Sequence, residues 1–235
     1  MNVVVDAIKN LNWSPLWISI KTAIVATIIA FFIGILVARF VMFRHERTKW
    51  LLDGFFTLPL VLPPTVAGFL LLLLFSPLHP LGMFLEKAFG IRVVQSWAGC
   101  VLAAAVVSFP LMYRNARSAF EQIDINLIYA GRTLGMSESR IFRKVVLPAA
   151  GPGIASGTVL TFARALGEYG ATMMLAGNIL GRTRTISTAI AAEVAANRYA
   201  TAGVWTTIII LISFGVVFGI NLITGRGMKQ VRRWQ

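Results

Sequence analysis

The sequence has little charge, one cysteine and two histidines. Only 13% of its 235 residues are Asp, Glu, Lys or Arg, against roughly 25% in soluble domains. The single cysteine, Cys100, cannot form an internal disulfide, and no two Cys or His residues have metal-ligand spacing. These shortages exclude a disulfide framework and a cysteine-based metal site, and they argue against an ordinary water-soluble domain.

Groups for enzymatic catalysis are also lacking. An enzyme must place a nucleophile, a general base or a metal ligand, but His45 and His79 both lie in predicted loops. Residues 177–183 (GNILGRT) are one residue short of a phosphate-binding loop and have no lysine. We therefore expect no catalytic site and no cofactor in this chain. If the protein drives active transport, another chain must hydrolyse ATP.

Hydrophobic residues make up 57% of the chain and gather in long uncharged runs. A helix rises about 1.5 Å per residue, so it needs roughly 20 apolar residues to cross about 30 Å of hydrocarbon. The runs predict an all-α, polytopic membrane protein with about five transmembrane helices in a single domain, residues 1–235. We expect the spans at residues 16–39, within 54–85, and at 97–113, 153–175 and 203–224.

The net charge of +13 is concentrated in the loops. In a soluble protein such an excess would suggest nucleic acid. Here, with the loop after the first span placed inside, the inner loops carry about twice as many Lys and Arg residues as the outer ones. We predict a multi-pass protein of the bacterial inner (cytoplasmic) membrane, with its first helix retained, its N-terminus outside and its C-terminus cytoplasmic. Its surroundings are lipid, and nucleic acid is not an expected partner.

Three prolines interrupt the second apolar run. Pro59, Pro63 and Pro64 remove backbone donors and clash with the preceding turn, which predicts a kinked or broken helix. Broken backbone inside a membrane must face protein or a water-filled cavity. Two interpretations stay open: Pro63, Pro64 and Thr65 line a translocation pathway, or the bend only serves packing between helices.

Arg164 and Glu168 are the only charges that we expect deep within a span. Their spacing of four places both on one helical face, where they must pair with each other or line an aqueous cavity. Either Arg164 attracts a dianion while Glu168 limits how tightly it binds, or the two form a structural ion pair. Gly215 and Gly219 in the last run similarly fit close helix packing, within the bundle or between copies.

A polar stretch at about residues 114–147 is the only predicted cytoplasmic loop long enough to form helices of its own. In it, residues 129–131 (Tyr-Ala-Gly) are followed after three residues by Gly135 and after nine more by residues 145–148 (VVLP). This spacing resembles the Glu-Ala-Ala loop of permease subunits of ATP-binding-cassette importers. The resemblance implies an ATPase-docking segment containing Tyr129, Ala130, Gly131, Gly135, Leu147 and Pro148.

The composition of this segment suits docking. Ala130 and Gly131 are small enough to let a short helix seat closely in a groove, Gly135 permits the turn that ends it, and Pro148 stops the next helix. Tyr129 stands where the family usually has Glu, and Gly131 where it has a second Ala. The alternative is an ordinary basic loop on the membrane surface.

Three further stretches resemble the signature segments of molybdate and sulfate permeases. They are residues 58–68 (LPLVLPPTVAG), 162–172 (FARALGEYGAT), and 177–179 (GNI) leading to 183–186 (TRTI). The TRTI ending is typical of the molybdate branch, although Ser187 replaces its usual proline. The resemblance implies a type I importer permease for molybdate, working as two copies with two cytoplasmic ATPase subunits and a periplasmic oxyanion-binding protein.

By this resemblance, ATP and Mg are used by the partner ATPase and not by this chain. Two kinds of alternative remain open. A sulfate or tungstate importer permease would share nearly every feature described above. A passive channel or an intramembrane enzyme would need no ATPase at all.

Overall fold

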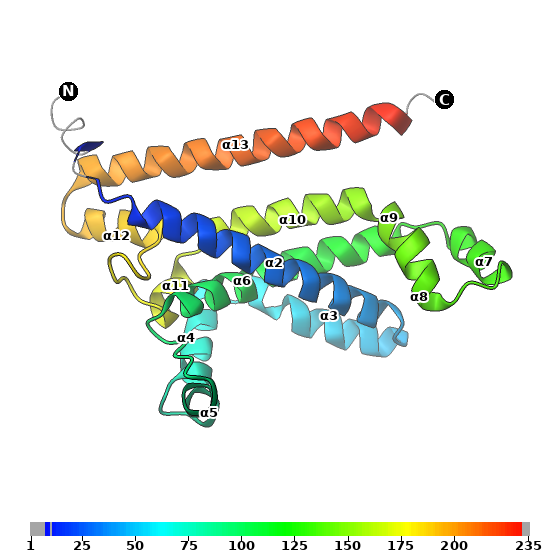
Figure 1. Ribbon diagram of the computed structural model, residues 1–235, viewed down its shortest axis with the longest axis horizontal. Helices are drawn as coiled ribbons and strands as arrows, with labels where there is room; N and C mark the ends of the chain where they lie inside the picture. Colours follow the sequence, from blue (N-terminus) through cyan, green and yellow to red (C-terminus); the bar gives the residue numbers. More distant parts are fainter. Residues whose placement is uncertain (1–7, 10, 232–235) are drawn as a thin grey trace.

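The computed structural model describes residues 8–9 and 11–231, with side chains described as far as residue 219. Within these residues the chain is helical and contains no strand (Figure 1). Three helices are long and apolar enough to cross a membrane, and two bent pairs bring the number to five if each pair is one span. The predicted all-α, polytopic fold is therefore confirmed. The candidate spans are α2 (Ser14–Met42), α6 (Trp97–Glu121) and the first part of α13 (Tyr199–Val231), the bent pair α3 (Glu46–Val61) and α4 (Pro64–Phe75), and the bent pair of Glu138–Ala149 with α10 (Gly151–Leu166).

Shorter helices lie at the two ends of this bundle (Figure 1). One end holds α7 (Ile125–Thr133), α8 (Glu138–Ile141), a π-helix (Phe142–Val146) and α9 (Leu147–Ala149). The other end holds α11 (Gly170–Leu175) and α12 (Ile186–Ala195), while α5 (Pro80–Phe89) follows α4 away from the bundle axis. The chain therefore has short helices at both ends of the bundle.

The tightest packing is between α2 and α6, which meet along small residues. Ala23, Ala26 and Ala30 of α2 and Ala103 and Ala104 of α6 are fully buried. A Cβ built on Gly34 of α2 would lie 2.8 Å from Met112 Cγ, closer than real atoms come. Small residues let helix backbones approach closely where hydrocarbon supplies no hydrophobic drive between helices, so this seam fixes the centre of the bundle.

The second span is broken where the prolines predict. Helix α3 ends at Val61, α4 begins at Pro64, and the two axes are bent by 106°. Pro64 occupies the first turn of α4, where its missing N–H would have no helical acceptor. Pro59 is accommodated inside α3, so the predicted interruption falls at residues 62–63.

Two other spans differ from the prediction. The fourth was expected to run unbroken over residues 153–175, but α10 ends at Leu166 and α11 begins only at Gly170. The third was expected to end near Tyr113, yet α6 continues to Glu121, through Pro110 and past the first arginines. A helix does not need to end at the membrane surface. The arginines of α6 therefore indicate where the surface lies, and not where the helix ends.

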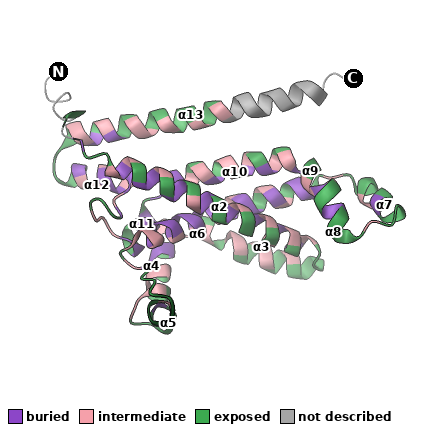
Figure 2. Ribbon diagram, viewed as in Figure 1, coloured by how far each residue is buried: buried purple, intermediate pink, exposed green. Residues whose placement is uncertain are grey.

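The part of the last helix, α13, whose side chains the structure describes is mostly uncovered by the rest of the chain (Figure 2). Of the residues in its apolar window, which lies within Tyr199–Gly219, only 11% are buried. A Cβ added to Gly215 or Gly219 would meet nothing within 4 Å. The close packing suggested by these two glycines is therefore not made within the described chain.

Candidate functional site

Helix α7, at one end of the bundle, carries three of the six predicted docking residues, Tyr129, Ala130 and Gly131. The Asp124 carboxylate caps its start by accepting a hydrogen bond from the Asn126 N–H at 2.9 Å. Gly135 ends it with φ of +71°, a conformation that glycine adopts without steric cost. There the Met136 N–H returns to the Gly131 carbonyl at 3.0 Å. The predicted turn at Gly135 is confirmed.

The two small residues of α7 face different ways. Gly131 is buried, and a Cβ on it would lie 3.0 Å from Ile141 Cγ1. Its close contact is therefore with Ile141 of α8 in the same chain, and Gly131 does not lie on the exposed face of α7. Ala130 is exposed, as are the apolar Leu127 and Leu134, the latter by 79%. Tyr129, where the family usually has Glu, is also exposed.

An ion pair joins α7 to α8. Arg132 Nε lies 2.7 Å from Glu138 Oε1. The hydrogen bond from Arg132 to this carboxylate raises the pKa of the guanidinium above its already high ordinary value. Both groups are about half exposed, so the pair adds little stability of its own. It links the helices on either side of the Gly135 turn.

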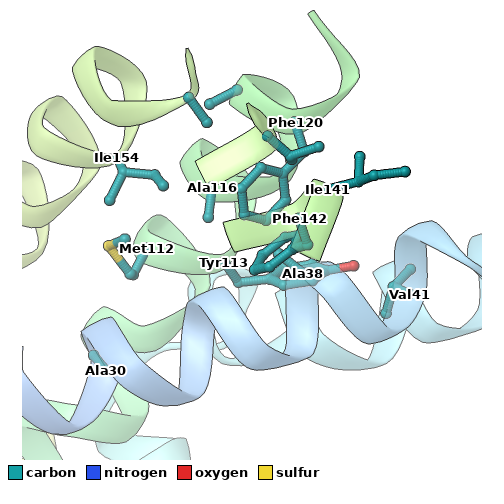
Figure 3. Close-up of a cluster of buried hydrophobic side chains, with 13 residues drawn as sticks. Ala30, Ala38, Val41, Met112, Tyr113, Ala116, Phe120, Ile141, Phe142 and Ile154 are labelled. Atoms are coloured by element: carbon teal, nitrogen blue, oxygen red, sulfur yellow. The ribbon is translucent and has the colours of Figure 1, made fainter. Parts of the chain in front are cut away.

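A hydrophobic cluster packs α8 and the π-helix against α2 and α6 (Figure 3). Ile141 is 1% exposed, and the Phe142 ring meets the Phe120 ring of α6 edge-on at 5.4 Å. The Arg39 guanidinium at the end of α2 lies 4.2 Å from the centre of the Phe142 ring. The cluster therefore connects α8 and the π-helix to α2 and α6.

Pro148 does not stop the helix that follows the docking segment. The helix continues through Leu147 and Pro148 to Ala149, and the chain then bends by 69° into α10. Proline lacks the N–H of an α-helical bond, and the preceding turn is a π-helix in which the Leu147 N–H reaches the Phe142 carbonyl. Leu147 is half-buried and Pro148 is exposed. The sequence predicted a break about two residues too early.

The second group of predicted residues meets where two broken spans touch. Helix α11 lies against α4, because a Cβ on Gly170 would be 3.0 Å from Pro64 Cβ and 3.1 Å from the Thr65 nitrogen. A Cβ on Gly68 would similarly lie 2.6 Å from the Ala171 Cα. The break after Pro63 and the break before Gly170 therefore adjoin each other.

Arg164 and Glu168 form an ion pair across the second of these breaks. Arg164 Nη1 lies 2.6 Å from Glu168 Oε2. The other oxygen, Oε1, accepts a hydrogen bond from the Ala171 N–H at 2.8 Å. The expectation that both lie on one face of a continuous helix is wrong, because α10 ends at Leu166. Glu168 is 2% exposed and Arg164 is partly exposed, so the contacts favour the structural ion pair.

A network that the sequence analysis missed holds α3 to α6. The Tyr113 hydroxyl donates to Asp53, and Arg117 pairs with the same carboxylate. Arg117 also bonds to Glu121 at 2.9 Å. Helix α3 has no buried residue, so these polar contacts and the Phe56 ring packed on Tyr113 attach it. The available signal was Asp53 itself, an acidic residue directly before an uncharged run.

The end opposite α7 has a hydrogen-bonded loop and a cavity. The Ile179 N–H donates to the Thr183 hydroxyl at 2.9 Å, and Arg184 Nε donates to the Asn178 side chain at 2.7 Å. The Ile186 N–H then donates to Ser19 of α2 at 2.8 Å. Beside this loop, a cavity of about 740 Å³ lies between the beginnings of α2 and α13 and the end of α12.

The arrangement of a helical segment mounted at one end of a bundle with broken spans can be compared with known proteins. The model of the family described as "Binding-protein-dependent transport system inner membrane component" matches residues 30–222. The chain belongs to this family. It is therefore a permease subunit of the inner membrane, with several spans and no enzymatic role of its own.

Relatives of this permease include proteins named for molybdenum. The putative molybdenum transport system permease protein YvgM of Bacillus subtilis (strain 168) is 38% identical over 209 residues, which are 89% of this chain and 92% of that protein. The molybdenum transport system permease protein ModB of Escherichia coli (strain K12) is 46% identical over 179 residues, 76% of this chain and 78% of that protein. The sulfate transport system permease protein CysT of Salmonella typhimurium (strain LT2) is 31% identical, over 98% of this chain and 88% of its own length.

Solved structures share the fold of this permease. A chain of the MetNI methionine ABC transporter in an inward-facing form aligns with a TM-score of 0.71, at 16% identity, over 90% of this chain and 94% of that chain. A chain of a bacterial ABC transporter for alginate aligns with a TM-score of 0.72 at 15% identity, over 91% of this chain and 78% of that chain. The fold is therefore that of an ABC importer permease, as the sequence predicted.

Proposed function

We propose that this permease carries molybdate across the inner membrane as part of an ATP-driven importer. The observation that carries the proposal is the identity of 38% and 46% to two molybdenum transport permeases over most of the chain. The sulfate relative matches a larger share of the chain but at 31% identity. Molybdate is therefore favoured over sulfate, with tungstate as the chemically nearest alternative.

The exposed face of α7 is the proposed contact with a cytoplasmic ATPase, which uses ATP and Mg. Leu127, Tyr129, Ala130 and Leu134 are exposed there, while Ile141 and Phe142 anchor the segment in the core. An ATPase that shifts residues 127–139 would tilt α2 and α6 through these anchors. The spans would then change from inward-facing to outward-facing.

A second copy of the chain and a periplasmic oxyanion-binding protein complete the proposed importer. Helix α13 offers a largely uncovered apolar surface to lipid or to another copy. The loop of residues 177–186 and the adjoining cavity of about 740 Å³ form the proposed surface for the binding protein. This assignment places the N-terminus outside, the C-terminus in the cytoplasm and α7 on the cytoplasmic side.

The proposed pathway runs along the junction of the two broken spans. Pro63, Pro64 and Thr65 lie at one break, and Gly170 of the other packs against them. Irregular backbone at membrane depth is tolerated where it is buried in protein or lines a cavity. Arg164 keeps part of its surface exposed beside this junction, whereas its contact with the buried Glu168 supports a structural role for the pair.

Uptake of labelled molybdate by cells with and without the gene tests the proposal. Gene-dependent uptake that persists in excess sulfate would support molybdate import, and competition by tungstate would show whether both metals are carried. Uptake abolished by sulfate would move the protein to the sulfate branch. No gene-dependent uptake would contradict both assignments, and failure to co-purify an ATPase would favour a passive channel.

A further inference from the structure

An open cavity of about 620 Å³ lies at the end of α2, beside the docking segment. Helix α2 is one of the three helices long enough to span the membrane. Its end therefore lies where hydrocarbon gives way to lipid headgroups. The cavity is lined by apolar and charged side chains together: Leu36, Arg39, Phe40, Phe43, Arg44 and Glu138.

The two arginines of this cavity are available to bind an external anion. Arg39 Nη2 lies 3.4 Å from the Ser139 hydroxyl, and its guanidinium stacks on Phe142. The Arg44 guanidinium lies 4.0 Å from the centre of the Phe40 ring. Among the residues whose side chains the structure describes, no carboxylate forms an ion pair with either arginine. Stacking on an aromatic face leaves guanidinium N–H groups free to donate.

Glu138 is the one acidic residue in the lining. Its carboxylate is already paired with Arg132 at 2.7 Å. That pairing offsets the acidic charge without using Arg39 or Arg44. The cavity therefore has a net positive character and fits an anion.

The apolar part of the lining consists of large, exposed side chains. Leu36, Phe40 and Phe43 are between 48% and 63% exposed. Leu36 and Phe40 are four residues apart and lie on one face of α2, with Phe43 and Arg44 one turn further on. A soluble anion would leave these side chains uncovered, whereas acyl chains would cover them.

We propose that this cavity binds an anionic phospholipid, with the headgroup phosphate held by Arg39 and Arg44 and the acyl chains lying along Leu36, Phe40 and Phe43. Basic pockets between membrane helices are suited to such headgroups. Because Arg39 also contacts Ser139 and Phe142, the bound headgroup lies against the docking segment. The cavity is thus a lipid site at the joint between the first span and the segment proposed to meet the ATPase.

Native mass spectrometry of the purified permease complex with added phosphatidylglycerol or phosphatidylcholine tests this proposal. The wild type should retain phosphatidylglycerol in preference to phosphatidylcholine. Arg44→Gln should weaken phosphatidylglycerol binding about fivefold, since one basic residue near an anionic surface contributes about 1 kcal/mol. Arg44→Lys should preserve most of it. The matched control is Arg47→Gln, because Arg47 is also exposed and lies three residues later, in α3, but does not line the cavity.

Three results would overturn the lipid site. Equal losses in Arg44→Gln and Arg47→Gln would reduce the effect to general surface charge. Equal retention of phosphatidylcholine would remove the role of the headgroup charge. Displacement of phosphatidylglycerol by inorganic phosphate would show a site for soluble anions only. None of these readouts requires transport, so they are independent of the uptake experiment.

Discussion

At the residue scale, Gly135 and Glu168 show how a single position depends on the backbone around it. Gly135 has φ of +71° and open space where a Cβ would be, so conformation and not crowding requires glycine. Glu168 is buried at the break between α10 and α11. It pairs with the Arg164 guanidinium and accepts a hydrogen bond from the Ala171 N–H. One residue shapes the surface proposed for docking, and the other holds the broken span together.

Replacing Gly135 with valine should abolish molybdate uptake while the protein remains in the membrane. A β-branched residue in the left-handed region costs about 1–2 kcal/mol, which is enough to reorganise an exposed turn. Co-purification of the ATPase measures the effect directly. Gly54→Val is the control, since Gly54 also has nothing within 4 Å but lies inside α3 without a positive φ. Unimpaired uptake by the Gly135 variant would contradict the docking assignment.

Glu168→Ala should destabilise the protein by about 1–3 kcal/mol, because it leaves the buried Ala171 N–H without an acceptor and removes the counter-ion of Arg164. Thermal unfolding in detergent measures the change. Glu86→Ala, at an exposed position in α5, should have little effect. If the pair is structural, Arg164→Leu combined with Glu168→Leu should cost less than the sum of the two single changes. Additive costs would show that the two side chains act independently.

At the element scale, some breaks were predictable and others were not. The break at Pro63 was readable because proline has no N–H to donate. The break at residues 167–169 was not, because it depends on Gly170 meeting Pro64 and Thr65, residues about 100 positions earlier. The turn at Gly135 could likewise be predicted, because it depends on the glycine itself. The inward orientation of Gly131 was not, since it depends on Ile141 folding back from α8.

Helix α3 is the element whose attachment is most open to test. Tyr113→Phe removes the donor to Asp53 but keeps the ring that packs on Phe56. Losing one such bond costs about 1 kcal/mol, so amide hydrogen exchange in α3 should rise about fivefold. Tyr169→Phe, at an exposed position outside α3, serves as the control. Unchanged exchange in α3 would show that apolar contacts alone hold it.

At the scale of the whole molecule, the two ends of the bundle should face opposite sides of the membrane. Cys100 is the only cysteine and is fully buried, so it should not react with a bulky maleimide. A cysteine introduced by Arg182→Cys should be labelled by a membrane-impermeant maleimide in intact cells. Leu134→Cys should be labelled only after the cells are opened. Labelling of Leu134→Cys in intact cells would reverse the proposed orientation.

The uncovered surface of α13 should also affect how fast the protein is degraded in the cell. Only 11% of the residues in the apolar window of α13 are buried, so this helix makes few contacts that would keep it in place. Local opening has its lowest free energy where packing is sparse, so α13 should be readily pulled from a lone subunit. Surveillance proteases of the membrane should therefore degrade copies that find no partners, and the amount of this protein at steady state should follow the supply of the subunits with which it assembles.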